Sequence, residues 1–268
     1  MAEDTGKYSA PALEKGLDIL ELLSLATEPL SMGQVAEQLS RSKGEIFRML
    51  VALERRGYIL RNPDSDRFEI GSRLFEMAMH VTPTRNLVTT AMRHIENVAH
   101  ELDQSCHIAV LTGTQIVVIA RAEAPGEMGF SVRLGYRRRA DRSTSGRVIT
   151  AFASPAQRAA TLSLLAAEYP DFHRAGFEAD LARVVAAGHD QGASASVAGV
   201  TDIGAPVIGE TGWAVASLTV PFIERAGASV SLLDARDVLM REAAIMSTDL
   251  SVGMPGGGQS PLATARRP

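Results

Sequence analysis

Cysteine is almost absent from this chain, whose 268 residues include only Cys106. A lone cysteine excludes an intrachain disulfide framework and a zinc site of the C-x-x-C type, and it suits the reducing cytoplasm. Cys106 stands next to His107, which suggests nucleophilic catalysis. Neighbours on a strand point to opposite faces, however, so we expect Cys106 to pack as a small apolar group.

Long apolar runs are also missing. No stretch approaches the ~20 residues that a helix needs to span a bilayer. The N-terminal segment MAEDTGKYSA is acidic and polar, where a secretory signal would be basic and then apolar. We therefore expect a cytoplasmic protein with no membrane partner.

The sequence lacks the common catalytic and cofactor motifs. The six histidines show no H-E-x-x-H spacing for a metal, and no G-x-G-x-x-G, Walker or G-x-S-x-G motif occurs. We therefore predict no metal ligand, no cofactor and no catalytic residue, and we expect that the protein is not an enzyme.

An overall positive charge is missing too. The net charge of −4 and the pI near 5.9 argue against a protein covered in cations, so a nucleic-acid footprint must be local. Such a segment exists between Arg41 and Arg73, where eight basic and five acidic residues give a local charge of +3. The length suits two domains, and 46% hydrophobic with 22% charged residues is typical of a globular chain.

Residues 31–71 predict a helix-turn-helix followed by a β-wing. Ser31 and Gln34 form a capping box at the start of one helix, and a second helix begins at Ser42 after a tight break. In the second helix, Ile46 and Leu50 recur at helical spacing with Met49 and Leu53 and so share a buried face. The stretch GYILRNPDSDRFEIG then predicts a hairpin. In this layout the second helix enters a DNA major groove.

The outward face of the second helix carries the candidate DNA contacts. Glu45 has two interpretations, because it completes a capping box with Ser42 but could also accept from a cytosine amino group. Capping is favoured, since local geometry explains both residues. The DNA-contacting residues that we expect are Ser31, Arg41, Ser42, Lys43, Gly44, Glu45, Phe47, Arg48 and Arg67. Upstream, Leu13, Leu17, Leu20 and Leu23 predict a helix that braces the pair.

The second half mixes strands and helices without strict βαβ alternation, which predicts an α+β domain with a mostly antiparallel sheet. We expect a helix over GSRLFEMAMHV that breaks at Pro83, and another from about Arg85 to Leu102. A hairpin is centred on Thr112–Thr114. Further expected strands are FSVRL, SASVAGV, IGAPVI and WAVASLTVPF, with helices over SGRVITAFA, SPAQRAATLSLLAAEY, FEADLARVVAAGHD and about residues 229–250.

Several of these segments together resemble the IclR family of bacterial transcriptional regulators. The resemblance rests on ALEKGLDILELL and the 31–71 motif, and on VRLGYRRRADRSTSGRVITAFA, GVTDIGAPV and AVASLTVP in the second half. It covers nearly the whole chain. It implies a winged helix-turn-helix joined by a linker helix to an effector-binding domain similar to GAF and PAS folds. The family usually carries small hydroxyl residues at the positions of Gly44 and Glu45, so the operator sequence does not transfer.

The resemblance sets the expected domain boundaries. They are a flexible N-terminus over 1–9, the DNA-binding domain over 10–72, a linker helix over 73–83, the effector-binding domain over 84–251 and a disordered tail over 252–268.

A dense arginine cluster lies in the second half. Like charges so close repel unless anions lie near them, and Glu123, Glu127 and Asp141 offer ion pairs as the simpler explanation. The alternative is an anchor for a ligand carboxylate, because a guanidinium meets a carboxylate with two parallel hydrogen bonds. The cluster comprises Arg133, Arg137, Arg138, Arg139 and Arg142. The family pattern turns Arg138 toward the effector cavity, which makes it the candidate anchor.

The same resemblance implies the remaining effector-cavity residues. Apolar walls would hold a small organic body while hydroxyls orient its polar end. The implied set is Met128, Phe130, Arg138, Thr144, Ser145, Val200, Asp202, Ser217 and Thr219.

These observations predict a ligand-responsive repressor of catabolic genes. It would bind a palindromic double-stranded DNA operator as a homodimer or homotetramer and sense a small organic acid. The alternatives are a metabolic enzyme that carries a winged domain, for which no catalytic constellation is found, and a protein-interaction adaptor built on the winged fold.

Overall fold

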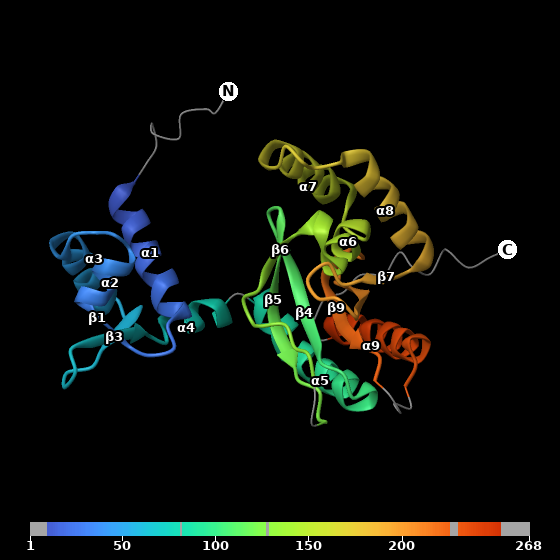
Figure 1. The fold of residues 1–268 in the computed structure, drawn as a ribbon, viewed down its shortest axis with the longest axis horizontal. Helices are drawn as coiled ribbons and strands as arrows, with labels where there is room; N and C mark the ends of the chain where they lie inside the picture. The colour runs from blue at the N-terminus through green and yellow to red at the C-terminus, as the bar shows by residue number, and fades with distance from the viewer. Residues whose placement is uncertain (1–9, 81, 127–128, 226–229, 253–268) are drawn as a thin grey trace. The chain divides into compact units, whose positions relative to one another are not determined.

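The computed structural model describes residues 10–80, 82–126, 129–225 and 230–252 (Figure 1). The chain divides into two compact units, Met1–Arg85 and Asn86–Pro268. The expected flexible N-terminus, nearly all of the expected tail and Met128 lie outside the described residues.

The first unit is a winged helix-turn-helix. Three helices are followed by a hairpin, and the hairpin joins a short N-terminal strand in an antiparallel sheet of order β1-β3-β2. The elements are α1 Pro11–Leu25, β1 Leu30–Ser31, α2 Met32–Gln38, α3 Lys43–Arg55, β2 Ile59–Arg61, β3 Arg67–Ile70 and α4 Arg73–His80.

Local capping determines where the helices begin. The Ser31 hydroxyl accepts from the amide of Gln34, and the Gln34 side chain accepts from the Ser31 amide, which confirms the capping box predicted for α2. Ser42 and Glu45 make the same reciprocal pair at α3. The turn between the two helices contains Ser40 with φ of 53°, a left-handed conformation that gives the tight break.

The core of the first unit corrects one expectation. Ile19 and Leu23 of α1 are buried against α2, α3 and the wing. Leu13 and Leu17, predicted to brace the helix pair, are 63% and 49% exposed. The 3.6-residue period rotates these two residues away from the core, since Ile19 and Leu23 define the inward face.

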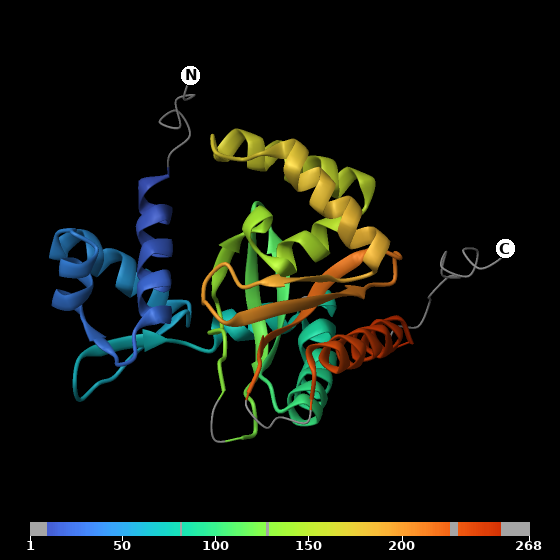
Figure 2. The ribbon, with the colours of Figure 1, turned by 45° about the vertical axis from the view of Figure 1, so that its right-hand side comes forward.

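The second unit is built on a six-stranded antiparallel sheet of order β6-β5-β4-β9-β8-β7, which confirms the predicted α+β class. Helices α5 and α9 cover one face, and α6, α7 and α8 lie on the other (Figure 2). The elements are α5 Thr82–Leu102, β4 Cys106–Thr112, β5 Gln115–Ala122, β6 Arg137–Arg139, α6 Thr144–Ala151, α7 Pro155–Glu168, α8 Arg174–Ala187, β7 Asp190–Ala193, β8 Val200–Ile208, β9 Ala214–Ile223 and α9 Leu232–Val252, with a 3₁₀ turn over Ala140–Arg142.

Alternation along β4 separates two environments. Cys106 and Ile108 join the core under α5 and α9, while Ala109 packs with Ile149 of α6 on the opposite face. His107 shares the parity of Ala109 and so points to the α6 face. Cys106 is 1% exposed, which confirms that it packs as a small apolar group, and burial raises the pKa of its thiol.

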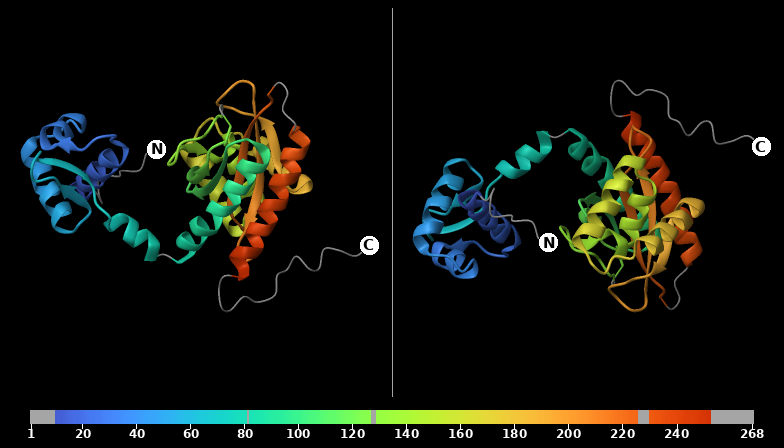
Figure 3. Two further views of the ribbon diagram at one scale, coloured as in Figure 1. Left: turned by 90° about the horizontal axis from the view of Figure 1, so that it is seen from below. Right: turned by 90° about the horizontal axis from the view of Figure 1, so that it is seen from above.

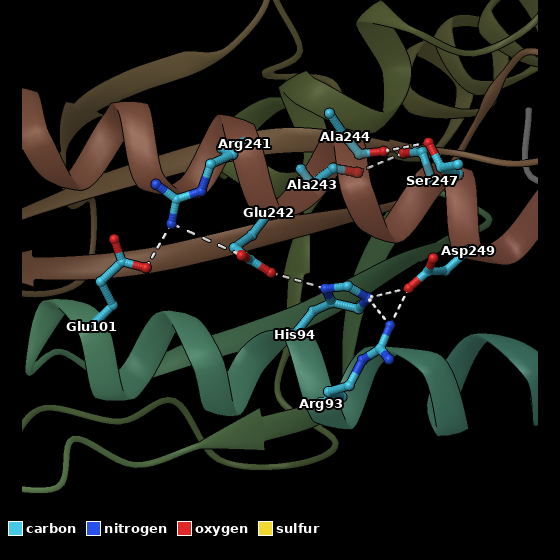
Figure 4. Close-up of polar contacts among 10 residues, drawn as sticks. Arg93, His94, Glu101, Arg241, Glu242, Ala243, Ala244, Ser247 and Asp249 are labelled. Atoms are coloured by element: carbon cyan, nitrogen blue, oxygen red, sulfur yellow. Dashed lines mark hydrogen bonds and ion pairs between the residues drawn. The ribbon is translucent and has the colours of Figure 1, made fainter.

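Helices α5 and α9 lie side by side (Figure 3). A polar network crosses between them, with His94 of α5 at its centre (Figure 4). His94 Nδ1 is 2.9 Å from Glu242 Oε2, and its Nε2 is 3.2 Å from Asp249 Oδ2. Arg93 also pairs with Asp249. The two helices are therefore joined by a buried polar contact as well as by apolar packing.

Two strand expectations in the second unit were wrong, and one helix boundary near the start of that unit was displaced. The two expected helices are present as α4 and α5, but α5 already begins at Thr82, so Pro83 lies in its first turn, where proline is tolerated. Residues 130–134 are not a strand; Arg121 Nη1 donates to Ser131 Oγ and the Val132 carbonyl there, and the strand that pairs with β5 is β6. Residues 194–199 form a loop between β7 and β8, where Gly199 has φ of 80°.

None of the helices in the described ranges is both long enough and apolar enough to cross a bilayer.

Candidate functional site

The recognition helix α3 presents an exposed surface of mixed chemistry. Lys43, Phe47 and Arg48 are exposed, with Phe47 at 53%, while Ile46 and Leu50 face the core. Gly44 has no atom within 4 Å of the position where a Cβ would lie, so it leaves open space on this surface. Within the described part of the chain, no hydrogen bond or ion pair holds Lys43 or Arg48. These two cations are therefore available to a polyanion.

Glu45 is held by its own unit. Its carboxylate caps Ser42, and Lys15 Nζ of α1 lies 2.5 Å from Glu45 Oε1. The hydrogen bond from Lys15, those from Ser42 and the charge of Lys15 lower the pKa of Glu45 to about 2. The geometry confirms the capping role. The ion pair between Lys15 and Glu45 also links α1 to α3, and because these residues are 30 positions apart, no local sequence pattern could predict it.

Arg41 and Arg67 flank the recognition helix but have partners. Arg41 Nη2 is 3.7 Å from Asp18 Oδ2, in an exposed pair. Arg67 Nη1 donates to the Pro29 carbonyl at 2.9 Å and to Gln34 Oε1 at 3.2 Å. Arg67 thus links the wing to α2 and to the capping box at Ser31. Its contact to DNA stays a prediction.

A cavity of about 650 Å³ lies within the second unit, between the sheet and the start of α6. Six of the residues expected at the effector site line it: Phe130, Arg138, Thr144, Ser145, Asp202 and Thr219. Val200 and Ser217 do not. Val200 is buried at the first position of β8, and the fully buried Ser217 hydroxyl lies 3.0 Å from Thr219 Oγ1, so it supports the lining from outside the cavity.

Hydroxyl groups line one part of the cavity. Ser145 Oγ is 2.9 Å from Thr219 Oγ1, and both residues are at least 96% buried. Thr144 and Ser145 occupy the first turn of α6, with Ser143 as the N-cap. Backbone amides of a first turn have no partner within the helix and carry its positive dipole end. This part of the cavity can form hydrogen bonds with a polar group of a ligand.

Arg138 reaches from β6 to the loop between β7 and β8. Its Nη1 donates to Tyr136 Oη at 3.2 Å and to Ser196 Oγ at 2.5 Å. Its Nη2 donates to the Ala195 carbonyl, and its Nε to that of Arg142. All four acceptors are neutral. Since a guanidinium has five N–H donors, one remains for another partner.

Two other arginines of the cluster, Arg139 and Arg142, form ion pairs with acidic residues. Arg139 binds Asp141 and Asp171, and its guanidinium lies 3.9 Å from the centre of the Tyr169 ring. Arg142 also pairs with Asp171. Of the three expected acidic partners, Asp141 pairs with the cluster, Glu123 pairs with Arg121 instead, and Glu127 lies outside the described residues. The simpler explanation thus holds for Arg139 and Arg142.

Several lining residues were missed at the sequence level, among them His107, Tyr136, Arg147, Ser194 and Ser196. Arg147 follows Thr144 by three residues, and this helical spacing could have revealed it. Strand alternation could have revealed His107. Cys106 was expected in the core, so its neighbour His107 had to point to the opposite face of the sheet. The serines belong to a segment expected as a strand, so no local signal placed them.

Asp202 and Arg147 add opposite charges to the lining. Burial raises the pKa of Asp202, while the Ser194 hydroxyl and the nearby arginines oppose this. Arg147 Nε is 2.6 Å from Oδ2 of the fully buried Asp190, which fixes the guanidinium against β7. Arg147 therefore forms an ion pair with a buried carboxylate, which Arg183 shares. Arg138 forms no ion pair with the described residues, although its charge acts on the carboxyl group of Asp202.

Comparison with known proteins covers both units. Residues 12–63 match the IclR helix-turn-helix domain, and residues 79–235 match the bacterial transcriptional regulator IclR C-terminal domain. The HTH-type transcriptional regulator BhcR of Paracoccus denitrificans is 24% identical over 94% of this chain and 90% of its own length. The probable transcriptional regulator SauR of Cupriavidus necator is 24% identical, but the match spans 56% of this chain and 60% of that relative.

Solved structures share the fold. An IclR homologue of Microbacterium hydrocarbonoxydans, complexed with 4-hydroxybenzoate, aligns with a TM-score of 0.73 and 21% identity over 90% of this chain and 99% of its own. HmgR of Pseudomonas aeruginosa aligns with a TM-score of 0.69 and 21% identity over 89% of this chain and 98% of its own. Because the family match spans both units, the chain belongs to the IclR family of bacterial transcriptional regulators, and it is a DNA-binding regulator rather than an enzyme.

Proposed function

We propose that this regulator is a repressor of catabolic genes whose second unit binds a small carboxylated metabolite. The observation that carries the proposal is Arg138, a cation at a cavity of about 650 Å³ whose hydrogen-bond acceptors are all neutral. Cavities of ~300 to 1,000 Å³ are typical of small-molecule sites. A ligand carboxylate would supply the charge that Arg138 lacks.

One further feature favours an acid over a neutral ligand. The homologue of Microbacterium hydrocarbonoxydans was solved in complex with 4-hydroxybenzoate, an aromatic acid. An acid of this kind agrees with the charge at Arg138.

The first unit would read a palindromic operator as part of a dimer or a dimer of dimers. One winged module buries too little DNA for useful specificity, so two heads are needed. Large apolar side chains are exposed on this unit: Leu13 and Leu17 on α1, and Leu74 and Phe75 on α4, with Phe75 at 68%. Exposed apolar groups of this size are typical of a protein–protein interface. We assign them to contact with a second copy.

Fluorescence anisotropy with a labelled duplex from the DNA flanking the gene tests this proposal. We expect tight binding that weakens steeply with salt, since phosphate contacts release counterions. Addition of the cognate acid should weaken binding by ~5- to 150-fold, the usual range of allosteric coupling. The matched amide of the same acid serves as the control and should have no effect.

Two results would contradict the proposal. Tighter DNA binding with the acid would exclude simple release from the operator. A lack of any salt-dependent DNA binding, at protein concentrations where size-exclusion chromatography shows a dimer, would favour the adaptor alternative.

A further inference from the structure

His107 is a buried polar side chain without a partner at the cavity. It is 6% exposed and lines the cavity from β4. No hydrogen bond or ion pair joins its ring to any residue in the described part of the chain. Buried polar side chains are mostly hydrogen-bonded, so an imidazole without a protein partner at a cavity wall is available to a group that enters the cavity.

The neighbours of His107 leave its ring uncharged. Its cross-strand partners are Thr219 on β9 and Arg121 on β5. The Arg121 guanidinium is held by Glu123, Ser131 and the Val132 carbonyl. Burial lowers the pKa of His107 to about 4, so the ring is neutral at physiological pH. A neutral imidazole offers one donor and one acceptor.

The wall around His107 suits a hydroxyl group better than a second carboxylate. The Thr219 hydroxyl lies beside it across the strand pair. Ser145 and Ser217 occupy two of its three hydrogen-bonding positions, which leaves one for a ligand. A carboxylate has only acceptor atoms and would be buried here beside a neutral ring, which is costly. A ligand hydroxyl both donates and accepts, and it matches the imidazole together with Thr219.

The charged end of the cavity lies elsewhere on the sheet. Arg138 pairs with Ile116 of β5, and Ile116 pairs in turn with Leu111 of β4. Leu111 and His107 are four residues apart on the same strand, which is ~13 Å at ~3.3 Å per residue. His107 and Arg138 therefore reach the cavity from different places along the sheet, and the apolar lining of the cavity includes Phe130 and Ile116.

We propose that His107, with Thr219, selects ligands that carry a hydroxyl group remote from their carboxylate, so that the effector is a hydroxylated acid. This inference rests on the proposed function, because it assumes that the acid occupies this cavity. His107 would then determine ligand specificity, a role that the sequence pattern did not predict for it.

Paired probes test the inference. Isothermal titration calorimetry would compare 4-hydroxybenzoate with benzoate, and 3-hydroxyphenylacetate with phenylacetate. We expect the hydroxylated member of at least one pair to bind the natural protein about tenfold or more tightly, because a site built for a hydroxyl is left with unpaired groups by the analogue. In His107→Leu the preference should fall to within about twofold, with the affinity for the unhydroxylated acid retained.

Two further variants control for folding and side-chain chemistry. His107→Gln keeps a donor and an acceptor and should restore part of the preference. Thr150→Val removes a hydroxyl that is buried in α6 but is not part of the cavity lining, and it should leave the preference unchanged. Thermal unfolding of each variant verifies that the second unit is folded.

The failures can be distinguished. If acids bind but hydroxylated and unhydroxylated members bind equally in the natural protein, or if His107→Leu keeps the full preference, the role of His107 is overturned and the carboxylate proposal stands. If none of the acids binds, and Arg138→Ala changes nothing, the carboxylate proposal fails and this inference fails with it.

Discussion

His94 and Glu242 face each other across two helices, with Nδ1 of the imidazole 2.9 Å from Oε2 of the carboxylate (Figure 4). The residues are 148 positions apart in the chain, and both side chains are at most 10% exposed. Asp249 contacts the other ring nitrogen at 3.2 Å. This contact joins the first helix of the second unit to its last, so the pair belongs to the structural core and lies apart from the cavity lining.

Removal of Glu242 should destabilise the second unit. Glu242→Ala leaves the buried His94 with one of its two partners, and hydrogen bonds to charged groups contribute about 1.5 to 3 kcal/mol. We expect a loss of that size in urea unfolding. Arg174→Ala is the control, because its pair with Glu178 in α8 is about half exposed and such pairs contribute under ~1 kcal/mol. Equal losses in the two variants would show that the His94 contact is energetically minor.

Arg48 on the recognition helix should contribute to base or phosphate contact. Arg48→Ala is expected to weaken operator binding by about 1 to 3 kcal/mol and, if a base edge is read, to relax preference at one position. Folding should be unaffected, since Arg48 is exposed and unpartnered among the described residues. Binding-site selection with both proteins measures this. Unchanged affinity and consensus would remove Arg48 from the interface.

Glu45 should act through structure and leave base readout to other residues. Glu45→Gln keeps an acceptor for the Ser42 amide and loses the charge opposite Lys15. We expect the operator consensus to stay the same and the unfolding temperature to fall slightly. Lys15→Met should produce a similar small fall. A consensus that shifts from cytosine toward adenine in Glu45→Gln would reassign the residue to the major groove.

Arg138 should be important for effector affinity in two ways, through its charge and through its hold on the loop at Ser196. Arg138→Ala is expected to weaken acid binding by about 1.5 to 3 kcal/mol, and Arg138→Lys should recover only part, because an ammonium lacks the planar fork. Ser196→Ala removes the loop contact and keeps the charge. If Ser196→Ala loses as much affinity as Arg138→Ala, the arginine acts by holding the loop.

Thr150 in α6 offers a stabilising substitution. Its Oγ1 is buried and has no hydrogen-bond partner among the described residues. Thr150→Val replaces that hydroxyl with a methyl group of similar shape, so we expect a gain of about 1 kcal/mol in unfolding free energy. Thr248→Val is the comparison, since that exposed hydroxyl already donates to the Ala244 carbonyl. A lower stability in Thr150→Val would mean that the hydroxyl has a partner.

Local interactions explain what could be predicted from the sequence. The capping boxes at Ser31 and Ser42 join residues three apart, and Pro155 follows its cap Ser154 directly, so the amino-acid order alone determined where α2, α3 and α7 begin. The hairpin at Gly113 likewise depends on adjacent residues, with φ of 61° there. These local features made the winged motif and the α+β class predictable from the sequence.

Tertiary packing decided the rest. Leu13 and Leu17 have the right period for a buried face, and only the neighbouring helices turned that face outward. Arg138 meets Ser196 across 58 positions, and His107 lies beside Thr219 because β4 pairs with β9. Contacts of this separation depend on strand order and loop path, which residue types do not encode locally. The sequence by itself therefore determined the helix starts and the family resemblance, whereas the fold alone brought Arg138, whose acceptors are neutral, and the unpartnered His107 to the wall of one cavity.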